Sequence, residues 1–189
     1  MLKKYLYLCF IFTVFPTITF AKVSAPKDLK YTVSPIVGYE TVFRAYPTPH
    51  TLTHMIYGAR LTAGIDIASA EVEYTKGSDT ENYLVAPQEI KTNQEKLKLG
   101  VRSTYRFNEF LFATGRLGGQ ATKTTREETS SGITTITEEP IKYDPYAGAH
   151  VGVSLGPVSV SIGATAIIRD VNDMSKNDVQ HTLSVTLGN

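Results

Sequence analysis

Four histidines are the residues of this 189-residue chain that could carry chemistry: His50, His54, His150 and His181. On a strand, a histidine and a serine two positions apart share one face, and a histidine needs such a partner within reach to pass a proton. No histidine here is followed by serine at that spacing. His150 and Ser154 are four residues apart, about 13 Å along a strand, which is too far for a proton relay. The sequence therefore predicts no catalytic residues and a protein that is not an enzyme.

Metal binding is the second chemistry that histidines could support. His50 and His54 have a spacing of four, which suits a metal on a helix, but Pro47 and Pro49 in YPTPHTLTHM favour an extended loop. Three aspartates in the last loop lack the D-x-D-x-D-G spacing of a calcium loop, and we expect a solvated turn there. They are Asp170, Asp173 and Asp178. The sequence predicts no metal site and no cofactor.

The elements that position these residues are best seen in the stretch 150–170, HVGVSLGPVSVSIGATAIIRD. From Pro145 to Ile168 there is no Asp, Glu, Lys or Arg, so one transmembrane helix is one interpretation. However, Gly156-Pro157 marks a turn in its middle, and apolar residues alternate with small or polar ones on both sides of that turn. A period of two separates residues onto two faces only in strands. The stretch therefore predicts two antiparallel strands joined by a tight turn.

The same alternation recurs along the chain and predicts eight strands. They are expected at 34–44, 54–66, 68–77, 95–107, 110–122, 141–155, 157–169 and 179–188. Tight turns at Ile67, Asn108-Glu109 and Gly156 alternate with longer connections, two of which are very long, at about 76–94 and 123–140. Short turns at one end and long loops at the other are typical of outer-membrane barrels. Strands of about ten residues suit a tilted crossing of the membrane.

Alternation alone does not say which of the two phases faces inward. A soluble lipocalin-like barrel hides its apolar phase, and a membrane barrel exposes it. Two features favour the membrane. Glycines are frequent in the polar phase, which fits the narrow interior of an eight-stranded barrel. Aromatic residues of the apolar phase lie near the expected strand ends, as in interfacial girdles; they are Phe43, Tyr57, Tyr74, Tyr105, Phe107 and Tyr143.

On these features residues 31–188 resemble the small OmpA/OmpX-type outer-membrane barrels of Gram-negative bacteria. The resemblance lies in the eight alternating strands, the tight turns at Asn108-Glu109 and Gly156-Pro157, and the long opposite loops. It implies an all-β, eight-stranded, antiparallel up-and-down transmembrane β-barrel, and it carries over no functional residues. Such barrels usually end on an aromatic residue, whereas this chain ends Thr186-Leu187-Gly188-Asn189.

Nine charged residues lie in the polar phase, and a barrel would direct them into its lumen. Four are acidic and five are basic: Glu40, Arg60, Asp66, Glu71, Glu73, Lys98, Arg102, Arg106 and Arg116. An unpaired charge inside a narrow barrel would cost several kcal/mol, so we expect an interior ion-pair network. Eight strands enclose a space that side chains can fill. The sequence therefore predicts a closed lumen and no open pore.

The N-terminus has the layout of a secretory signal peptide. Lys3 and Lys4 precede an apolar run of 11 residues, Tyr5 to Phe15, which is too short to span a bilayer as a helix. A small-x-small site predicts cleavage near Ala21. The predicted division is a signal peptide at 1–21, a lead-in at 22–30 and an outer-membrane barrel at 31–189. The net charge of +1 argues against nucleic-acid binding.

The segment 122–137, TKTTREETSSGITTIT, is rich in threonine, which favours strands without requiring burial. One hypothesis is a hairpin that continues its flanking strands above the membrane and binds a partner by strand addition; the alternative is a flexible polar loop. The candidate contact residues are Thr124, Thr125, Thr129, Thr134, Thr135 and Thr137.

The predicted function is therefore structural or surface-interacting, in contact with membrane lipid and with an extracellular protein or other surface partner through the loops. Two other classes stay open on the sequence. One is a lipid-modifying enzyme of the same membrane, in which His150 would have a partner on a neighbouring strand. The other is a soluble periplasmic lipocalin-like barrel that carries an apolar ligand.

Overall fold

The computed structural model describes residues 29–84 and 89–188. Within these residues the chain forms nine strands and one short 3-10 helix, η1. The strands are β1 (Lys30–Arg44), β2 (His50–Ile65), β3 (Ala68–Asn82), β4 (Glu89–Arg106), β5 (Leu111–Ser130), β6 (Ile133–Glu138), β7 (Lys142–Leu155), β8 (Val158–Ile167) and β9 (Asp178–Gly188), and η1 is Met174–Lys176. The predicted signal peptide and nearly all of the predicted lead-in lie outside the described residues.

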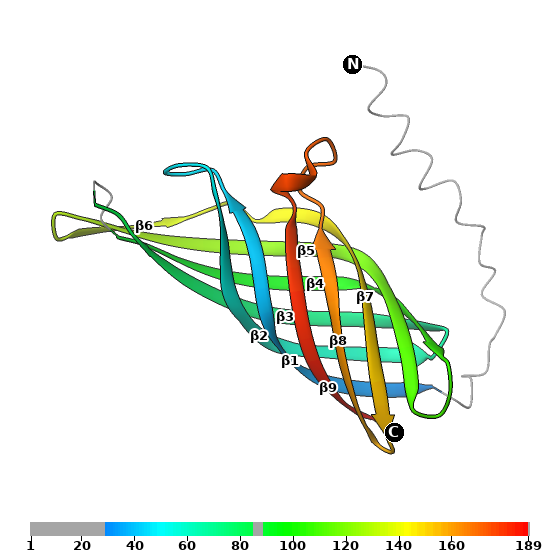
Figure 1. The fold of residues 1–189 in the computed structure, drawn as a ribbon. Helices are drawn as coiled ribbons and strands as arrows, with labels where there is room; N and C mark the ends of the chain where they lie inside the picture. The colour runs from blue at the N-terminus through cyan, green and yellow to red at the C-terminus, as the bar shows by residue number, and fades with distance from the viewer. Residues whose placement is uncertain (1–28, 85–88, 189) are drawn as a thin grey trace.

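Eight of these strands close into a ring (Figure 1). Each strand pairs antiparallel with its neighbours in the order β4-β3-β2-β1-β9-β8-β7-β5, and β5 pairs back to β4. The eight-stranded antiparallel barrel predicted from the alternation is confirmed. β6 lies outside the ring and pairs only with the far part of β5, from Thr125↔Glu138 to Ser130↔Ile133. The tight turns and the end of β9 lie at one end of the barrel, called the turn end, and the longer connections lie at the other, called the loop end (Figure 1).

The two segments expected as very long loops are largely strand. β3 and β4 stay paired as far as Asn82↔Glu89, and β4 pairs with β5 as far as Glu89↔Thr129. Together with β6 they form a four-stranded sheet that projects from the ring at the loop end (Figure 1). For 76–94 the prediction of a loop was wrong, because both faces of this sheet are mostly polar and no apolar alternation marks the strands. For 123–140 the chain forms the hairpin that was one of the two hypotheses for that segment. A smaller correction concerns His50, which begins β2 and does not lie in the preceding loop.

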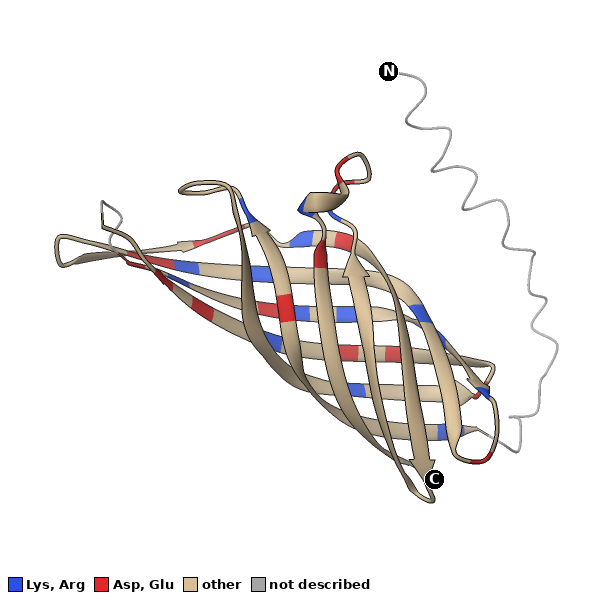
Figure 2. Cartoon of the chain, in the orientation of Figure 1, with Lys and Arg blue, Asp and Glu red and all other residues tan. Residues whose placement is uncertain are grey.

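The exposure of side chains on the two faces of the ring shows which phase of the alternation points into the lumen and which points outward. Lys98 on β4 has no exposed surface, whereas its neighbour Leu99 is 55% exposed. The same contrast holds around the ring, where charged positions occur along the middle of the strands (Figure 2). The apolar phase faces outward and the polar phase is buried, as in a membrane barrel. The soluble lipocalin-like alternative, which needs an apolar interior, is therefore wrong.

The outward apolar band has a visible limit at the loop end. Outward residues of the neighbouring strands β3, β4 and β5 change from apolar to charged at Lys76, Glu95 and Lys123. On β2 the outward residues before Met55 are threonines. We therefore take the membrane-spanning parts of these strands to lie between these positions and the tight turns. Within the described residues, no helix is long and apolar enough to cross a membrane.

Candidate functional site

The middle of the barrel holds a cluster of five buried charges. The Glu73 carboxylate accepts hydrogen bonds from Arg60 Nε at 2.8 Å and from Lys98 Nζ. It also forms ion pairs with Arg60 Nη2 at 2.7 Å and with Arg116 Nη1 at 2.8 Å. Arg116 Nη2 also lies 2.7 Å from Glu71 Oε1. Arg60 and Lys98 are the direct cross-strand partners of Glu73, so that the sheet register itself delivers two of these contacts. The resulting group of two acids and three bases spans the lumen from β2 to β5.

A glutamine extends this cluster toward the loop end. Gln180 on β9 accepts from Lys98 and donates to Glu40 Oε1 at 2.9 Å. Glu40 also accepts from Lys96, and His54 Nε2 lies 3.2 Å from Glu40 Oε2. Lys96 lies inside the expected strand 95–107 and in the same phase as Lys98, so the alternation could have identified it. Gln180 was missed because an uncharged polar residue gives no ion-pair signal.

Tyr146 on β7, the strand next to β5, was missed as well, and it joins β7 to the cluster. Its hydroxyl donates to Glu71 Oε1 at 2.5 Å, and the Arg116 guanidinium carbon lies 5.1 Å from its ring centroid. The ring needs space that only glycine leaves on the two strands across from it. A Cβ on Gly100 or Gly118 would overlap the Tyr146 ring or its hydroxyl. Glycine in the polar phase therefore makes room for a buried aromatic side chain.

The buried charges of the described residues balance in number. Five acids and five bases have 9% exposure or less: Glu40, Glu71, Glu73, Asp79 and Asp178 against Arg44, Arg60, Lys96, Lys98 and Arg116. Those not predicted lie at the loop end, where Arg44 donates to Asp79 at 2.8 Å and Arg169 lies 2.5 Å from Asp178. The expectation of a solvated turn was wrong for Asp178, which is fully buried. Burial of paired charges in equal number avoids the cost of an isolated buried ion.

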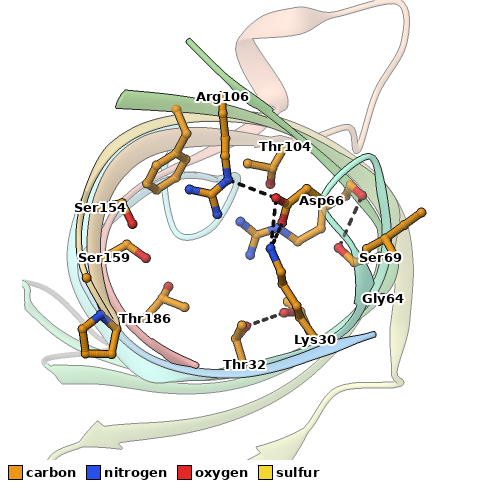
Figure 3. Close-up of a pocket in the computed structure, with 16 residues that line it drawn as sticks. Lys30, Thr32, Gly64, Asp66, Ser69, Thr104, Arg106, Ser154, Ser159 and Thr186 are labelled. Atoms are coloured by element: carbon orange, nitrogen blue, oxygen red, sulfur yellow. Dashed lines mark hydrogen bonds and ion pairs between the residues drawn. The ribbon is translucent and has the colours of Figure 1, made fainter. Parts of the chain in front are cut away.

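The other predicted interior charges lie at the turn end, in a different setting (Figure 3). Arg106 Nε donates to Asp66 Oδ2 at 3.0 Å, and Lys30 Nζ reaches the same carboxylate at 3.2 Å. The side chains of Asp66, Arg106 and Lys30 are 36 to 43% exposed, so this group borders solvent. Arg102 lies deeper and donates to the Thr114 hydroxyl at 3.3 Å. A cavity of about 270 Å³ opens between these residues and the opposite wall.

His150 is buried in the polar phase, but neither of its ring nitrogens has a hydrogen-bond partner among the described residues. A general base needs its partner within hydrogen-bond reach. The catalytic partner on a neighbouring strand that the enzyme hypothesis required is therefore not found in the part of the chain that the structure describes. Nor do three or more His, Cys, Asp or Glu side chains of these residues gather as a metal site would require.

The projecting sheet contains the predicted threonine hairpin. Ser131 and Gly132 have φ angles of 51° and 81°, the left-handed pair of a two-residue hairpin turn. The hydroxyls of Thr129 and Thr134 lie 3.0 Å apart across the two strands, and Thr134, Thr135 and Thr137 are exposed. Thr124 differs from the other predicted contact residues because it is buried and lines the loop-end mouth.

An ion pair between His50 and Glu81 joins β2 to the far end of β3 in this sheet. His50 Nε2 lies 2.5 Å from Glu81 Oε1, and its Nδ1 lies 2.7 Å from the Thr48 carbonyl oxygen. The carbonyl of Thr48 and the carboxylate of Glu81 both favour the doubly protonated ring, and together they raise the pKa of His50 above its ordinary value of 6.5. His50 lies beyond the outward apolar band, at the loop end.

A closed ring of eight strands with an apolar exterior and a charged interior defines a small transmembrane β-barrel. Solved structures of this class are similar to the chain over most of its length. Ail of Yersinia pestis, solved with the heparin analogue sucrose octasulfate, superposes with a TM-score of 0.56 at 12% identity, over 86% of this chain and 99% of Ail. Neisserial surface protein A gives 0.59 at 10% identity, over 84% and 96%. The outer membrane protein OprG of Pseudomonas aeruginosa gives 0.54 at 11% identity, over 85% and 95%.

No protein-family model and no curated protein matches the chain. At 10 to 12% identity the similarity to these structures is one of fold. It confirms the predicted resemblance to the small OmpA/OmpX-type barrels, and it assigns no function to a residue.

Proposed function

We propose that this chain is a non-enzymatic outer-membrane protein, exported with cleavage near Ala21, whose lumen is closed by ion pairs and which acts at the cell surface through its projecting sheet. One observation supports this most directly. The charged cluster that joins β2, β3, β4 and β5 is linked through Gln180 to β9 and through Tyr146 to β7, so that side chains cross the lumen between opposite walls.

A closed lumen predicts a specific electrical result. Planar-bilayer recordings of the folded protein should give no large, stable conductance, because the buried side chains leave no continuous water path. The matched variant removes one acid and one base together, Glu73→Ala with Lys98→Ala, and should conduct. Altered mobility of unheated samples on an SDS gel confirms that both proteins are folded. A stable, water-filled conductance of the natural protein would disprove the closed lumen.

The surface role is supported by the free edge of β6. Ser130 and Ile133 flank a two-residue turn and form a hydrogen-bonded pair, so the N–H of Thr134 points away from β5. Ile133 and Ile136 are 73% and 66% exposed on the same short strand. An exposed edge with apolar side chains is suited to bind an extended segment of a partner by strand addition. Hydrogen exchange should be slow at Thr135, which faces β5, and fast at Thr134.

The net charge of the segments at the loop end indicates which kind of partner could bind there. Residues 76–95, 123–142 and 169–178 contain seven lysines and arginines against eleven aspartates and glutamates. Ail was solved with an octasulfate, but this balance does not favour a polyanion as the ligand of the present chain. A neutral or basic partner fits the loop end better.

Topology in the cell can be tested with single cysteines, because the natural chain has one cysteine, Cys9, inside the predicted signal peptide. Thr135→Cys on β6 should react with a membrane-impermeant maleimide on intact cells. Ser159→Cys at the turn end is the matched control and should react only after the outer membrane is opened. The opposite labelling pattern, or recovery of the protein in the soluble periplasm, would contradict the proposed location.

A further inference from the structure

The turn-end cavity differs from the rest of the lumen in its charge. Three bases line it, namely Lys30, Arg102 and Arg106, and Asp66 is its only acid among the described residues. The deeper lumen offers no spare carboxylate to this end, because its five buried acids are matched by five buried bases. The cavity therefore carries an excess of positive charge that no described residue neutralises.

Arg102 carries this excess most clearly. Its one hydrogen bond to a described side chain goes to the Thr114 hydroxyl at 3.3 Å, and no described carboxylate lies within ion-pair distance of it. Arg60 and Arg116 are close enough to repel it. Glu71 and Asp66 attract it, but each of these carboxylates already accepts a hydrogen bond from another arginine. A guanidinium with five donors is thus left largely unpaired at the inner end of the cavity.

The opposite wall supplies neutral hydrogen-bonding groups. Figure 3 shows Ser154, Ser159 and Thr186 across the opening from Asp66 and Arg106. The hydroxyls of Ser154 and Ser159 make no hydrogen bond to another described residue, whereas Thr186 is bonded to Ser34 at 2.8 Å. Hydroxyls that face guanidinium and ammonium groups across a small cavity are the donors that surround a bound oxyanion in proteins.

We propose that the turn-end cavity is a binding site for a phosphate-type oxyanion, held by Arg102, Arg106 and Lys30 and by the hydroxyls of Ser154 and Ser159. The volume of about 270 Å³ accepts a phosphate group with its first water molecules or with a small substituent. Arginine forms paired hydrogen bonds to phosphate, and a bound anion would neutralise Arg102 without disturbing the deeper ion pairs. The site depends neither on the closed lumen nor on the projecting sheet, so it can fail or hold separately from the proposed function.

The test is a titration of the folded full chain with inorganic phosphate, in a maltoside detergent that carries no phosphate, in chloride-containing Tris buffer. Backbone amide resonances of Ser154, Ser159 and Thr104 and the side-chain Nε–H resonances of Arg102 and Arg106 are followed by NMR. We expect saturable shifts at these residues. The variant with Arg102→Gln and Arg106→Gln should bind phosphate at least about tenfold more weakly, because each arginine contributes a charge-assisted hydrogen bond.

Lys176→Gln, at the other end of the barrel, is the matched control and should bind like the natural protein. If Arg102→Gln does not fold, as judged by its SDS gel mobility, the pair Lys30→Gln and Arg106→Gln removes the two more exposed charges instead. Absence of saturable shifts in the natural protein, or equal affinity in the charge-removal variant, would overturn the site.

The source of the oxyanion is decided in nanodiscs that contain phosphatidylglycerol. If these resonances already lie at their phosphate-bound positions and do not respond to added phosphate, a lipid headgroup occupies the site. If they lie at the free positions and move on titration, the ligand is a free phosphate or a phosphorylated small molecule.

Discussion

The middle of the lumen and its turn end are built from the same strands but handle charge in opposite ways. In the middle, Glu73 contacts three bases and is fully buried. At the turn end, Asp66 contacts two bases and its side chain is 36% exposed. The buried charges of the described lumen, taken together, are equal in number, whereas the turn-end cavity has three bases for one acid. The difference indicates that buried charges must be balanced by charges of opposite sign. An excess of positive charge is possible only where solvent screens it or a bound anion neutralises it.

This comparison assigns the two regions different roles. A buried network contributes to stability only while all its members are present, because loss of one partner leaves an uncompensated charge. A half-exposed group contributes little to stability, since solvent screens it, but it remains free to bind. The middle should therefore be sensitive to substitution in unfolding experiments, and the turn end in ligand-binding experiments.

The largest effect is expected from Glu73→Gln. The substitution leaves Arg60, Lys98 and Arg116 with one fewer buried carboxylate, and breaking such a pair costs about 3–5 kcal/mol. The free energy of unfolding in detergent and urea should fall by that amount. Glu95→Gln, which removes an outward-facing partner of Lys76, is the control and should change it little. Equal losses in both variants would show that the buried network is not what stabilises the barrel.

Leu99→Arg tests whether the outward face of β4 contacts lipid, in contrast to the inward face that carries the buried Lys98. Lys98 is fully buried in the lumen, while Leu99 one residue later is exposed on the outward face. A charge on the lipid face near the middle of the membrane costs about 2–4 kcal/mol, so unfolding from a lipid bilayer should become easier by that amount. Lys123→Arg, outside the apolar band, is the matched control and should have no measurable effect. A tolerated Leu99→Arg would mean that this face does not contact lipid.

Asp66→Asn tests whether the charges at the turn end affect ligand binding more than they affect stability. Because the Asp66 carboxylate is more than one-third exposed, the free energy of unfolding should fall by less than about 1 kcal/mol. Phosphate affinity should rise, since Arg106 and Lys30 lose the acid that competes with a bound anion. Calorimetric titration with inorganic phosphate measures this change beside the natural protein. Weaker phosphate binding in Asp66→Asn would contradict the assignment of Asp66 as the competitor.

The sequence predicted the parts of this structure that follow from alternation. The strands around Gly156-Pro157 were placed to within two residues, because their apolar phase is uninterrupted. The inward position of Glu73, Arg60 and Lys98 followed from their phase in the alternation. Their cross-strand pairing depends on the register of the strands, which the sequence did not predict. The link from Arg116 to Glu71 and the position of Tyr146 against Glu71 could not be predicted, since contacts across a lumen depend on the stagger of the strands.

The projecting sheet shows the complementary limit of sequence analysis. Its strands continue β3, β4 and β5 without a break, but they leave the membrane, and with it the requirement for an apolar face. Where neither face contacts lipid, the sheet is stabilised by hydrogen bonds between its strands and by threonine's preference for an extended backbone. Neither of these produces a strong alternation of apolar and polar residues in the sequence.

The smallest effect is expected at the loop end, where His50 pairs with Glu81. Because the pKa of His50 is raised in the folded protein, its contribution to stability is complete below about pH 6.5, the ordinary value, and is lost as the pH rises through the raised value. The contribution of a partly exposed pair is less than about 1 kcal/mol. NMR titration of the imidazole should give a pKa above 6.5 in the natural protein and a lower one in Glu81→Gln. The difference in unfolding free energy between the natural protein and His50→Gln should shrink between pH 6 and 9. A difference that grows over this range would mean that the neutral ring is the stabilising form, and that Glu81 does not act as its charged partner.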